Sequence, residues 1–197
     1  MTFRIEKKIF IKKENFFEFR KKLLSNNAKT LYEPRKIESV YFDNVKKQMF
    51  YDSIEGLTPR KKLRVRNYPD ETKIKFLLEN KISSIEGRFK NSIGITRKYY
   101  ELIKLKGIFD SSYGLCKPIL NIIYNREYLK KDDVRITLDS DISYNLTNNK
   151  TIKKDANIIV ELKTSINKNL DDLFEEYPFQ EIRFSKYCNG IGLFNKY

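Results

Sequence analysis

The sequence contains no histidine, no tryptophan and only two cysteines among its 197 residues. The lack of histidine excludes Ser-His-Asp and Cys-His catalysis, histidine general acids and histidine-ligated zinc. Cys116 and Cys188 stand far apart and form no C-x-x-C pair, so no cysteine-based metal or redox motif exists. Two isolated thiols fit a reducing compartment, and we expect both to be inert, small packing residues.

Long apolar runs are also missing. The N-terminal stretch MTFRIEKKIF lacks the apolar region of a signal peptide, and no run approaches the ~20 residues that span a bilayer. The few glycines and prolines are scattered, with no low-complexity linker and no internal repeat. We therefore expect one continuous domain, residues 1–197, in a cytoplasmic protein without a membrane segment of its own.

Positive charge is in excess, with 40 lysines and arginines against 26 acidic residues and a net charge of +14. Such a balance predicts an anionic partner or an anionic surface. Asparagine, lysine and isoleucine are used freely along the whole chain, which is typical of a compositional bias that adds lysine without function. Arginine positions therefore carry more weight than lysine positions.

Helical features occur in three segments. Apolar residues near helical spacing, with acidic residues early and basic residues late, predict a helix over Lys13–Ser25. A shorter helix is expected over Tyr99–Lys106, and a third over Leu170–Glu176, which is followed by Pro178. In the first helix, five residues are expected to pack against the rest of the protein: Phe16, Phe17, Phe19, Leu23 and Leu24.

Apolar and charged residues alternate in most of the remaining segments. The expected strands are Phe3–Ile11, Lys62–Tyr68, Leu77–Ile82, Arg135–Asp141 and Ile158–Thr164. Because side chains along a strand point to opposite faces in turn, each strand has one apolar and one charged face. In the stretch RKKLRVRNY (60–68), Leu63 and Val65 alternate with Lys62, Arg64 and Arg66.

Two arrangements of these strands are compatible with the pattern. One is an antiparallel sheet with its charged face in water. The charged faces nevertheless repeat one motif, in which two charged residues stand two positions apart. The pair is either two cations, as in Arg64/Arg66, or a carboxylate followed by a lysine, as in Glu6/Lys8, Glu79/Lys81 and Glu161/Lys163. The alternative is a closed barrel with the charged faces inside. Inward cations would repel each other unless the channel holds water and a polyanion.

Eight segments, in order, resemble the VTC-type polyphosphate polymerase domain of the triphosphate tunnel metalloenzyme (CYTH-like) superfamily. They are RIEKKIFI (4–11), SVYFDN (39–44), IEGLTPRKKLRVRNY (54–68), LENK (78–81), YNRE (124–127), VRITLDSD (134–141), IIVELKTS (158–165) and RFSKYCNGI (183–191). Segment 54–68 is the most specific match. The resemblance implies an α+β fold, an eight-stranded antiparallel β-barrel that forms a polar tunnel and is flanked by a few helices.

The resemblance also implies an activity, the transfer of the ATP γ-phosphate to a growing inorganic polyphosphate chain with Mn²⁺ or Mg²⁺. ATP and polyphosphate would be the partners and nucleic acid would not; coupling to export would need a separate membrane partner. The implied catalytic residues are Arg64, Arg66, Lys81, Lys163 and Lys186. The implied phosphate-binding residues are Lys8, Lys62, Arg97, Arg126 and Arg135. The first choice of metal ligand is Glu161, followed by Glu6, Asp139 and Asp141.

Two positions depart from the superfamily pattern. Hydrolytic branches open with E-x-E-x-K, whereas this chain has Arg4 in place of the first glutamate, which favours the polymerase branch. The family also carries a basic residue on the strand after Lys81, where this chain offers Arg88, Lys90, Arg97 and Lys98. We favour Arg97, because it precedes an aromatic pair as the family residue roughly does.

These residue types suit phosphate chemistry. Arg64 and Arg66 would lie roughly 6.5 Å apart along one strand face, a spacing that suits neighbouring phosphates. Phosphoryl transfer needs positioning and electrostatic stabilisation rather than a protein nucleophile, so the missing histidine is no obstacle.

Two other functions remain open. One is a tripolyphosphate or nucleoside triphosphate hydrolase of the same superfamily, which needs the same cations and a positioned water. The other is a non-catalytic binder of polyanions, including RNA. The repeated carboxylate-x-lysine pairs argue against an RNA binder, because carboxylates repel a nucleic acid unless metal ions are present.

Overall fold

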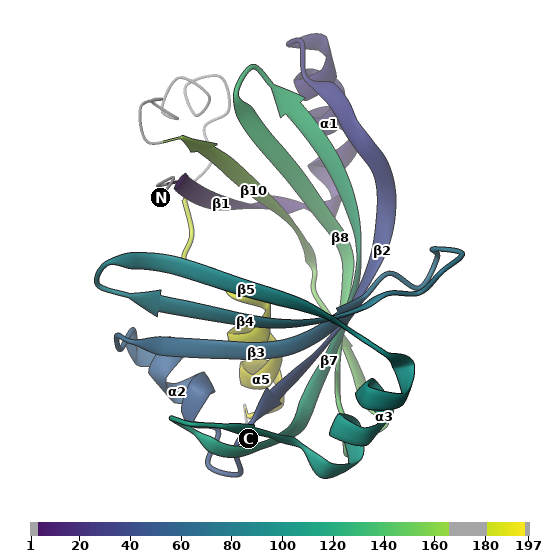
Figure 1. Ribbon diagram of the computed structural model, residues 1–197. Coiled ribbons are helices and arrows are strands. Elements are labelled where there is room, and N and C mark those ends of the chain that lie inside the picture. The colour runs from purple at the N-terminus through teal and green to yellow at the C-terminus, as the bar shows by residue number, and fades with distance from the viewer. Residues whose placement is uncertain (1–3, 166–180, 196–197) are drawn as a thin grey trace. The chain divides into compact units, whose positions relative to one another are not determined.

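A computed structural model describes residues 4–165 and 181–195 as a mostly antiparallel sheet with helices, an α+β fold (Figure 1). Its strands are β1 (Arg4–Lys12), β2 (Lys29–Asp43), β3 (Arg60–Asn67), β4 (Phe76–Ser84), β5 (Gly87–Ile95), β6 (Ile108–Asp110), β7 (Gly114–Lys131), β8 (Val134–Leu146), β9 (Ile152–Lys154) and β10 (Asn157–Ser165). Its helices are the 3₁₀ helix η1 (Lys13–Asn15), α1 (Phe16–Ser25), α2 (Gln48–Glu55), α3 (Arg97–Lys106) and α5 (Lys186–Phe194). None of these helices combines the length and the apolar character that crossing a membrane requires.

The predicted elements are found where the alternation and spacing placed them. All five expected strands are strands, and the two expected helices on described residues are α1, preceded by η1, and α3, which starts two residues early. Phe3 and the helix expected over Leu170–Glu176 lie outside the described residues. The helices α2 and α5 were not predicted.

The strands are hydrogen-bonded in the order β1-β10-β8-β7-β2-β3-β4-β5, with β6 beside β7 and β9 beside β8. Within the described residues this order has two ends, β1 and β5, so the expected closed eight-stranded barrel and its tunnel are not confirmed. The outer edge of β1 has another partner. Ile9 forms an antiparallel bridge with Glu181, and the Ile182 amide donates to the Lys8 carbonyl at 2.8 Å. Part of the edge that barrel closure would need is therefore occupied.

The chain divides into two compact units. Unit 1 comprises residues 1–35, 124–142 and 154–184, and unit 2 comprises residues 36–123, 143–153 and 185–197. The long strands β2, β7 and β8 each contribute residues to both units. The expectation of a single domain over residues 1–197 stays a prediction.

The core of unit 1 lies between α1 and the apolar face of β1, β8 and β10 (Figure 1). Residues two apart along β1 and β10, such as Ile9 and Ile11, meet Val160 and Ile158 directly across the antiparallel ladder. The apolar half of the period-two pattern is thus fully used in packing. One expectation is wrong, because Phe17 of α1 is 80 % exposed and does not pack in the core.

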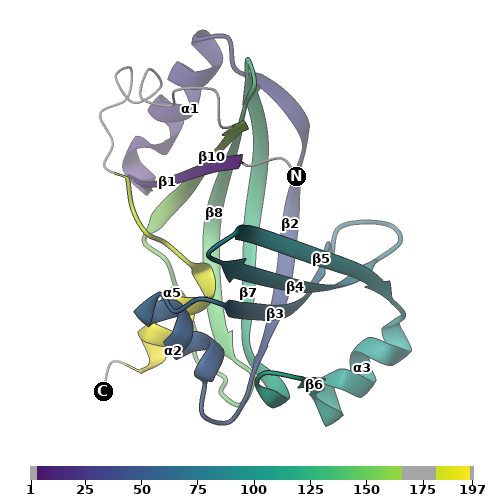
Figure 2. The same cartoon turned by 60° about the vertical axis from the view of Figure 1, so that its left-hand side comes forward.

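In unit 2, the buried carboxylate of Asp43 joins β2 to α2 and α5. Asp43 accepts hydrogen bonds from the Met49 and Phe50 amides in the first turn of α2, at 3.1 and 3.0 Å. It also accepts one from the Tyr187 hydroxyl of α5 at 2.5 Å. Burial raises the pKa of Asp43 despite these hydrogen bonds. Figure 2 shows α2 and α5 side by side, and the ring of Tyr187 stacks on Tyr41 at 5.0 Å. Asp43 therefore holds together the helices beside β3.

Replacement of Asp43 tests this role. We expect Asp43→Ala to lower the free energy of unfolding by about 3 kcal/mol, because it removes a helix cap and leaves a buried hydroxyl without an acceptor. Tyr187→Phe should cost only about 1 kcal/mol, since it removes one hydrogen bond and leaves the cap in place. Urea unfolding gives both values, with the exposed Asp70→Ala as the matched control. Equal effects of Asp43→Ala and Asp70→Ala would contradict the assignment.

Candidate functional site

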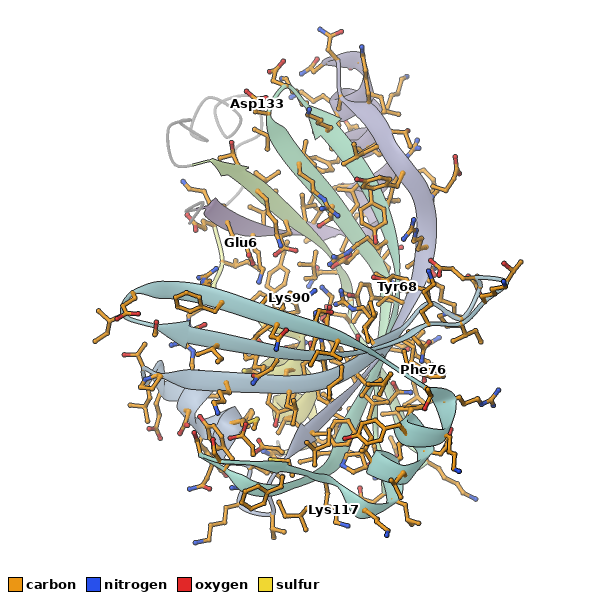
Figure 3. All side chains as sticks on the ribbon, viewed as in Figure 1. Glu6, Tyr68, Phe76, Lys90, Lys117 and Asp133 are labelled. Atoms are coloured by element: carbon orange, nitrogen blue, oxygen red, sulfur yellow. The ribbon has the colours of Figure 1, made fainter. Side chains whose placement is uncertain are left out.

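The charged face of unit 1 is built by rows of side chains that cross β1, β10 and β8. In one row Lys8 stands opposite Glu161, which stands opposite Thr137. In the adjacent row Glu6 stands opposite Lys163, which stands opposite Arg135. Cross-strand partners share a face, so the sequence-predicted residues of these strands do meet. Glu6 is labelled on β1 in Figure 3.

Glu161 is the hub of this face. Lys163 Nζ lies 3.2 Å from Glu161 Oε1, and Arg126 Nη2 of β7 lies 3.8 Å from Oε2. Burial alone would raise the pKa of Glu161, but a side-chain hydrogen bond with Glu6 and the charges of Lys163, Lys8 and Arg126 lower it well below the usual range. Glu161 is therefore an anionic group held inside a ring of cations.

Glu6 lies between the two lysines of the same rows. Its Oε1 is 3.1 Å from Lys8 Nζ, and its Oε2 is 3.6 Å from Lys163 Nζ. Lys8 also donates to the Phe184 carbonyl at 3.0 Å, which fixes the direction of its side chain. Glu6 and Glu161 thus form a carboxylate pair, which we call the Glu6–Glu161 dyad.

Asp139 has a different role from the one expected. Arg126 donates to both of its carboxylate oxygens, from Nε at 2.5 Å and from Nη2 at 2.7 Å, and Asp139 is fully buried. Burial by itself would lower the pKa of Arg126, but the carboxylates of Asp139 and Glu161 help to raise it well above its ordinary value. Since both oxygens of Asp139 bind Arg126, we assign Asp139 to the positioning of Arg126 rather than to a metal. Asp141 is likewise engaged, by Lys13 and Asn125.

Arg135 is held by aromatic rings. Its guanidinium carbon lies 5.3 Å from the ring centre of Tyr128 and 5.9 Å from that of Tyr32. Within the part of the chain that the structure describes, its buried Nε has no hydrogen-bond partner. Cation–π contact orients the guanidinium without using its N–H donors. Arg135 therefore keeps hydrogen-bonding capacity for an anion.

Unit 2 carries a second charged face, on β3, β4 and β5. The antiparallel registers place Lys62 opposite Lys81, and Lys81 opposite Lys90, in one row of three lysines. Like charges directly across a sheet destabilise it. Such a row is more stable when an anion lies over it, so it is a strong candidate for phosphate binding. Lys90 is labelled on β5 in Figure 3.

Glu79 neutralises the next row. Arg64 contacts Glu79 Oε2 through Nε and through Nη2, each at 2.6 Å, and Arg64 Nη1 donates to the Tyr41 hydroxyl at 2.7 Å. Arg66 Nε lies 3.9 Å from the same carboxylate, and Lys90 also pairs with it. Burial alone would raise the pKa of Glu79, but Arg64, Arg66 and Lys90 lower it to about 2. Glu79 therefore sets the directions of three cations.

A hydroxyl at the start of α5 connects Lys62 with that helix. Ser185 accepts from Lys62 Nζ at 2.9 Å and from the Cys188 amide at 3.4 Å, so it both caps α5 and holds the lysine. Lys186 is the first residue of α5, next to this hydroxyl in the chain. In residues 185–187, Ser185 thus binds Lys62 and Tyr187 binds Asp43, and Lys186 stands between them in the chain.

Arg97 was favoured because it precedes an aromatic pair, but it does not lie on the strand after Lys81. Arg97 is the exposed first residue of α3, because the side chain of Thr96 caps this helix by accepting from the Tyr99 amide at 3.2 Å. The strand after Lys81 is β5, and its Lys90 meets Glu79. Lys90 was one of the four basic residues that the sequence offered for this strand. Its position opposite Lys81 follows only from the register of β4 and β5.

The participants that were not predicted as site residues include Glu79, Lys90 and Tyr41. Glu79 had a signal in the sequence, since it stands two residues before Lys81 as Glu6 does before Lys8. The hydroxyl of Tyr41 accepts a hydrogen bond from Arg64. No local pattern in the sequence marks a tyrosine for this contact.

A divalent metal has one candidate position among these residues. The described chain contains no cluster of three or more His, Cys, Asp or Glu side chains suited to a metal. The Glu6–Glu161 dyad offers two carboxylates that both contact Lys163 Nζ, and the buried Thr137 Oγ1 opposite Glu161 has no hydrogen-bond partner within the described residues. Mg²⁺ is usually bound by one or two carboxylates together with substrate phosphates and water. The dyad fits that requirement.

The depressed pKa of Glu79 predicts a pH dependence of stability. We expect Glu79→Gln to lower the free energy of unfolding at neutral pH by about 3 kcal/mol, because buried cations lose their counter-charge. A folded-state pKa below the unfolded value stabilises the protein above the unfolded pKa. The difference between wild type and variant should therefore shrink as pH falls from about 4.5 toward about 2.

Urea unfolding at several pH values measures this difference. The control is Glu86→Gln, which removes an exposed carboxylate from the turn between β4 and β5. A Glu79→Gln deficit that stays constant down to about pH 2 would show that the ion cluster does not cause it.

Comparisons with known proteins agree with the fold. Among solved structures, a proposed adenylate cyclase from Bacillus halodurans is 14 % identical, with 99 % of this chain and 98 % of the other covered and a TM-score of 0.67. A protein from Pyrococcus horikoshii is 17 % identical, with 98 % and 100 % covered and a TM-score of 0.59. A proposed adenylate cyclase from Vibrio parahaemolyticus is 13 % identical, with 97 % and 98 % covered and a TM-score of 0.59. At these identities the likeness is one of fold alone.

The sequence also matches a family model. No curated protein matches the chain significantly. The model of the VTC domain matches residues 3–113 and 107–195, which together make up nearly the whole sequence. The resemblance inferred from the eight segments is thereby confirmed. The chain belongs to the VTC domain family.

Proposed function

We propose that this protein is a polyphosphate polymerase, which transfers the γ-phosphate of ATP to a growing inorganic polyphosphate chain in a metal-dependent reaction. Membership of the VTC domain family supports this assignment. The observation that carries it is the charged face of unit 1, where the Glu6–Glu161 dyad is surrounded by Lys8, Lys163 and Arg126. Cations bind phosphate oxygens, and a carboxylate pair among them is of use only if it holds a metal ion or another cation.

The cations of both units serve distinct tasks in this proposal. Arg126 and Arg64 are each fixed by a carboxylate, Asp139 and Glu79, so they present preorganised positive charge to phosphate oxygens. Lys163 and Lys81 are flexible point charges that follow a moving chain. Arg135, oriented by Tyr128, would bind a phosphate through the donors that the ring leaves unused. Within each unit, such a mixture of fixed and mobile cations suits a polyanion.

No protein nucleophile is required for the transfer. A terminal oxygen of the primer, already anionic, attacks the γ-phosphorus, the bond to the β,γ-bridging oxygen breaks, and ADP leaves with that oxygen. The chain grows by one phosphate. Arg126, which lies beside the Glu6–Glu161 dyad, would stabilise the charge on the transferred group, which is the main contribution that proteins make to phosphoryl transfer. Mn²⁺ or Mg²⁺ bound by Glu161 and Glu6 would neutralise phosphate oxygens. Use of ATP as donor agrees with the cytoplasmic location expected from the sequence.

The purified protein should convert γ-labelled ATP into ADP and acid-insoluble labelled phosphate chains when Mn²⁺ or Mg²⁺ and a short polyphosphate primer are supplied. Chelation of the metal should stop the reaction. Release of labelled orthophosphate without chain growth would replace the polymerase with a triphosphate hydrolase. Binding of polyphosphate or RNA without any turnover of ATP would replace the enzyme with a polyanion-binding protein.

Glu161→Gln separates catalysis from binding. We expect turnover to fall by about 100-fold or more, because the variant loses a carboxylate of the dyad. Polyphosphate affinity should be unchanged or higher, since one negative charge leaves a cationic face. Exposed Glu14→Gln, the same chemical change outside the charged faces, should keep wild-type turnover. Filter binding and the labelling assay measure the two quantities, and thermal unfolding checks that the variant is folded. Wild-type turnover of Glu161→Gln would contradict a role for the dyad.

A further inference from the structure

A group of exposed apolar side chains lies on unit 2 where α3 is followed by the β6–β7 hairpin. Leu105 and Phe109 are each 77 % exposed, Leu115 is 51 % exposed and Leu102 is 44 % exposed. We call these four residues the α3–hairpin surface. None of them belongs to either charged face described above, so the proposed phosphate chemistry does not account for them.

Packing inside unit 2 does not account for the leucines of α3 either. The residues that bury this helix are Tyr100 and Ile103, and the ring of Tyr100 stacks on Phe76 of β4 at 4.6 Å. At about 100° per residue, Leu105 lies on the opposite side of the helix from these two. An apolar residue at the solvent-facing pole of an amphipathic helix costs hydration and contributes nothing to the core. A group of such residues bordered by polar ones is typical of a surface that binds a partner.

The two elements that carry these four side chains, the end of α3 and the hairpin, lie next to each other. Phe109 and Leu115 are direct cross-strand partners in the hairpin, so their side chains share a face. At Gly107, which has a φ of +90°, an added Cβ would lie 3.0 Å from Leu115 Cδ1 and 3.1 Å from the Lys117 side chain. Lys117 Nζ donates to the Leu105 carbonyl at 3.0 Å. The end of α3 and the hairpin are thus in contact, and Figure 2 shows β6 next to α3.

Basic residues border this surface and carboxylates near it are already neutralised. The exposed lysines are Lys98, Lys104, Lys106 and Lys117, the last labelled in Figure 3. Of the two acidic residues in the segment 97–117, Glu101 pairs with Lys104 at 3.6 Å, and Asp110 pairs with Lys61 at 3.1 Å. The border of the apolar group therefore has a net positive charge.

We propose that the α3–hairpin surface docks the protein onto an anionic lipid bilayer. Leucine and phenylalanine side chains enter the boundary between headgroups and acyl chains, while the lysines reach up to the lipid phosphates. Charge complementarity favours this partner, since cytoplasmic-type leaflets carry acidic lipids. Protein interfaces instead are depleted in lysine, and nucleic acids need aromatic stacking rather than exposed leucines. The inference does not depend on the proposed polymerase activity.

Vesicle co-sedimentation tests the proposal with the full chain. The protein should bind vesicles with about 30 % phosphatidylglycerol more tightly than pure phosphatidylcholine vesicles, with binding that weakens as salt rises from about 0.1 to about 0.5 M. Leu105→Asp/Phe109→Asp should weaken binding to the anionic vesicles by roughly tenfold or more. Lys106→Gln/Lys117→Gln should weaken it at low salt and have little further effect at high salt.

Matched controls separate this surface from general attraction between a basic protein and acidic lipid. Val45→Asp/Ile85→Asp changes two apolar residues elsewhere in unit 2, which are 93 % and 92 % exposed, and Lys73→Gln/Lys75→Gln removes two exposed positive charges there. Both should bind vesicles more tightly than the corresponding surface variants. Equal binding by surface and control variants would overturn the proposal.

Light scattering of the same proteins tests whether a second copy of this chain, rather than a lipid bilayer, covers the α3–hairpin surface. If the wild type is a dimer and Leu105→Asp/Phe109→Asp is a monomer, the surface is an interface between copies of this chain and the lipid proposal is wrong. Unchanged mass together with loss of vesicle binding supports it. Because the mutated side chains are largely exposed, we expect the variants to stay folded. Circular dichroism checks that they keep their helices.

Discussion

Opposite charges on neighbouring strands form the interaction on which both charged faces depend. Because side chains alternate along each strand, the apolar face fills the core and the other face must carry whatever residues remain. Here these are largely arginine, lysine and glutamate, and the buried ones among them, such as Arg64 and Arg66, need a counter-charge nearby. Glu161 in unit 1 and Glu79 in unit 2 supply it from the neighbouring rows. A face left with more cations than carboxylates is ready to bind an anion.

The two hub carboxylates illustrate how one motif gives two kinds of site. Glu79 is almost completely buried, and it binds Arg64, Arg66 and Lys90 directly, so its role is to hold cations. Glu161 instead lies beside a second carboxylate, Glu6, with lysines on both sides. Two adjacent carboxylates repel each other unless a cation or a proton lies between them. This difference is why the metal proposal belongs to unit 1 and not to unit 2.

Much of the fold could be predicted because it depends on local alternation. The strands that carry Ile9, Val65 and Val160 were found from the period of two alone, and α1 and α3 from the helical spacing. The helices α2 and α5 were missed because they are stabilised by a distant residue. Asp43 caps α2 and binds Tyr187 of α5, and no signal in either helix indicates that partner. Arg97 was misplaced because a local feature was overlooked. The side chain of Thr96 caps α3, so Arg97 is the first residue of that helix and not part of the preceding strand.

The sequence by itself determined which side chains share a face, because that follows from the geometry of one strand. It therefore placed Arg64 with Arg66, and Glu161 with Lys163, on charged faces. Only the tertiary structure decided what each charge meets, because partners come from register between strands far apart in the chain. Arg126 binds Asp139 across β7 and β8, and no local pattern in either strand predicts this pair. The register of β4 and β5 aligned Lys81 with Lys90, and no local pattern contains that information.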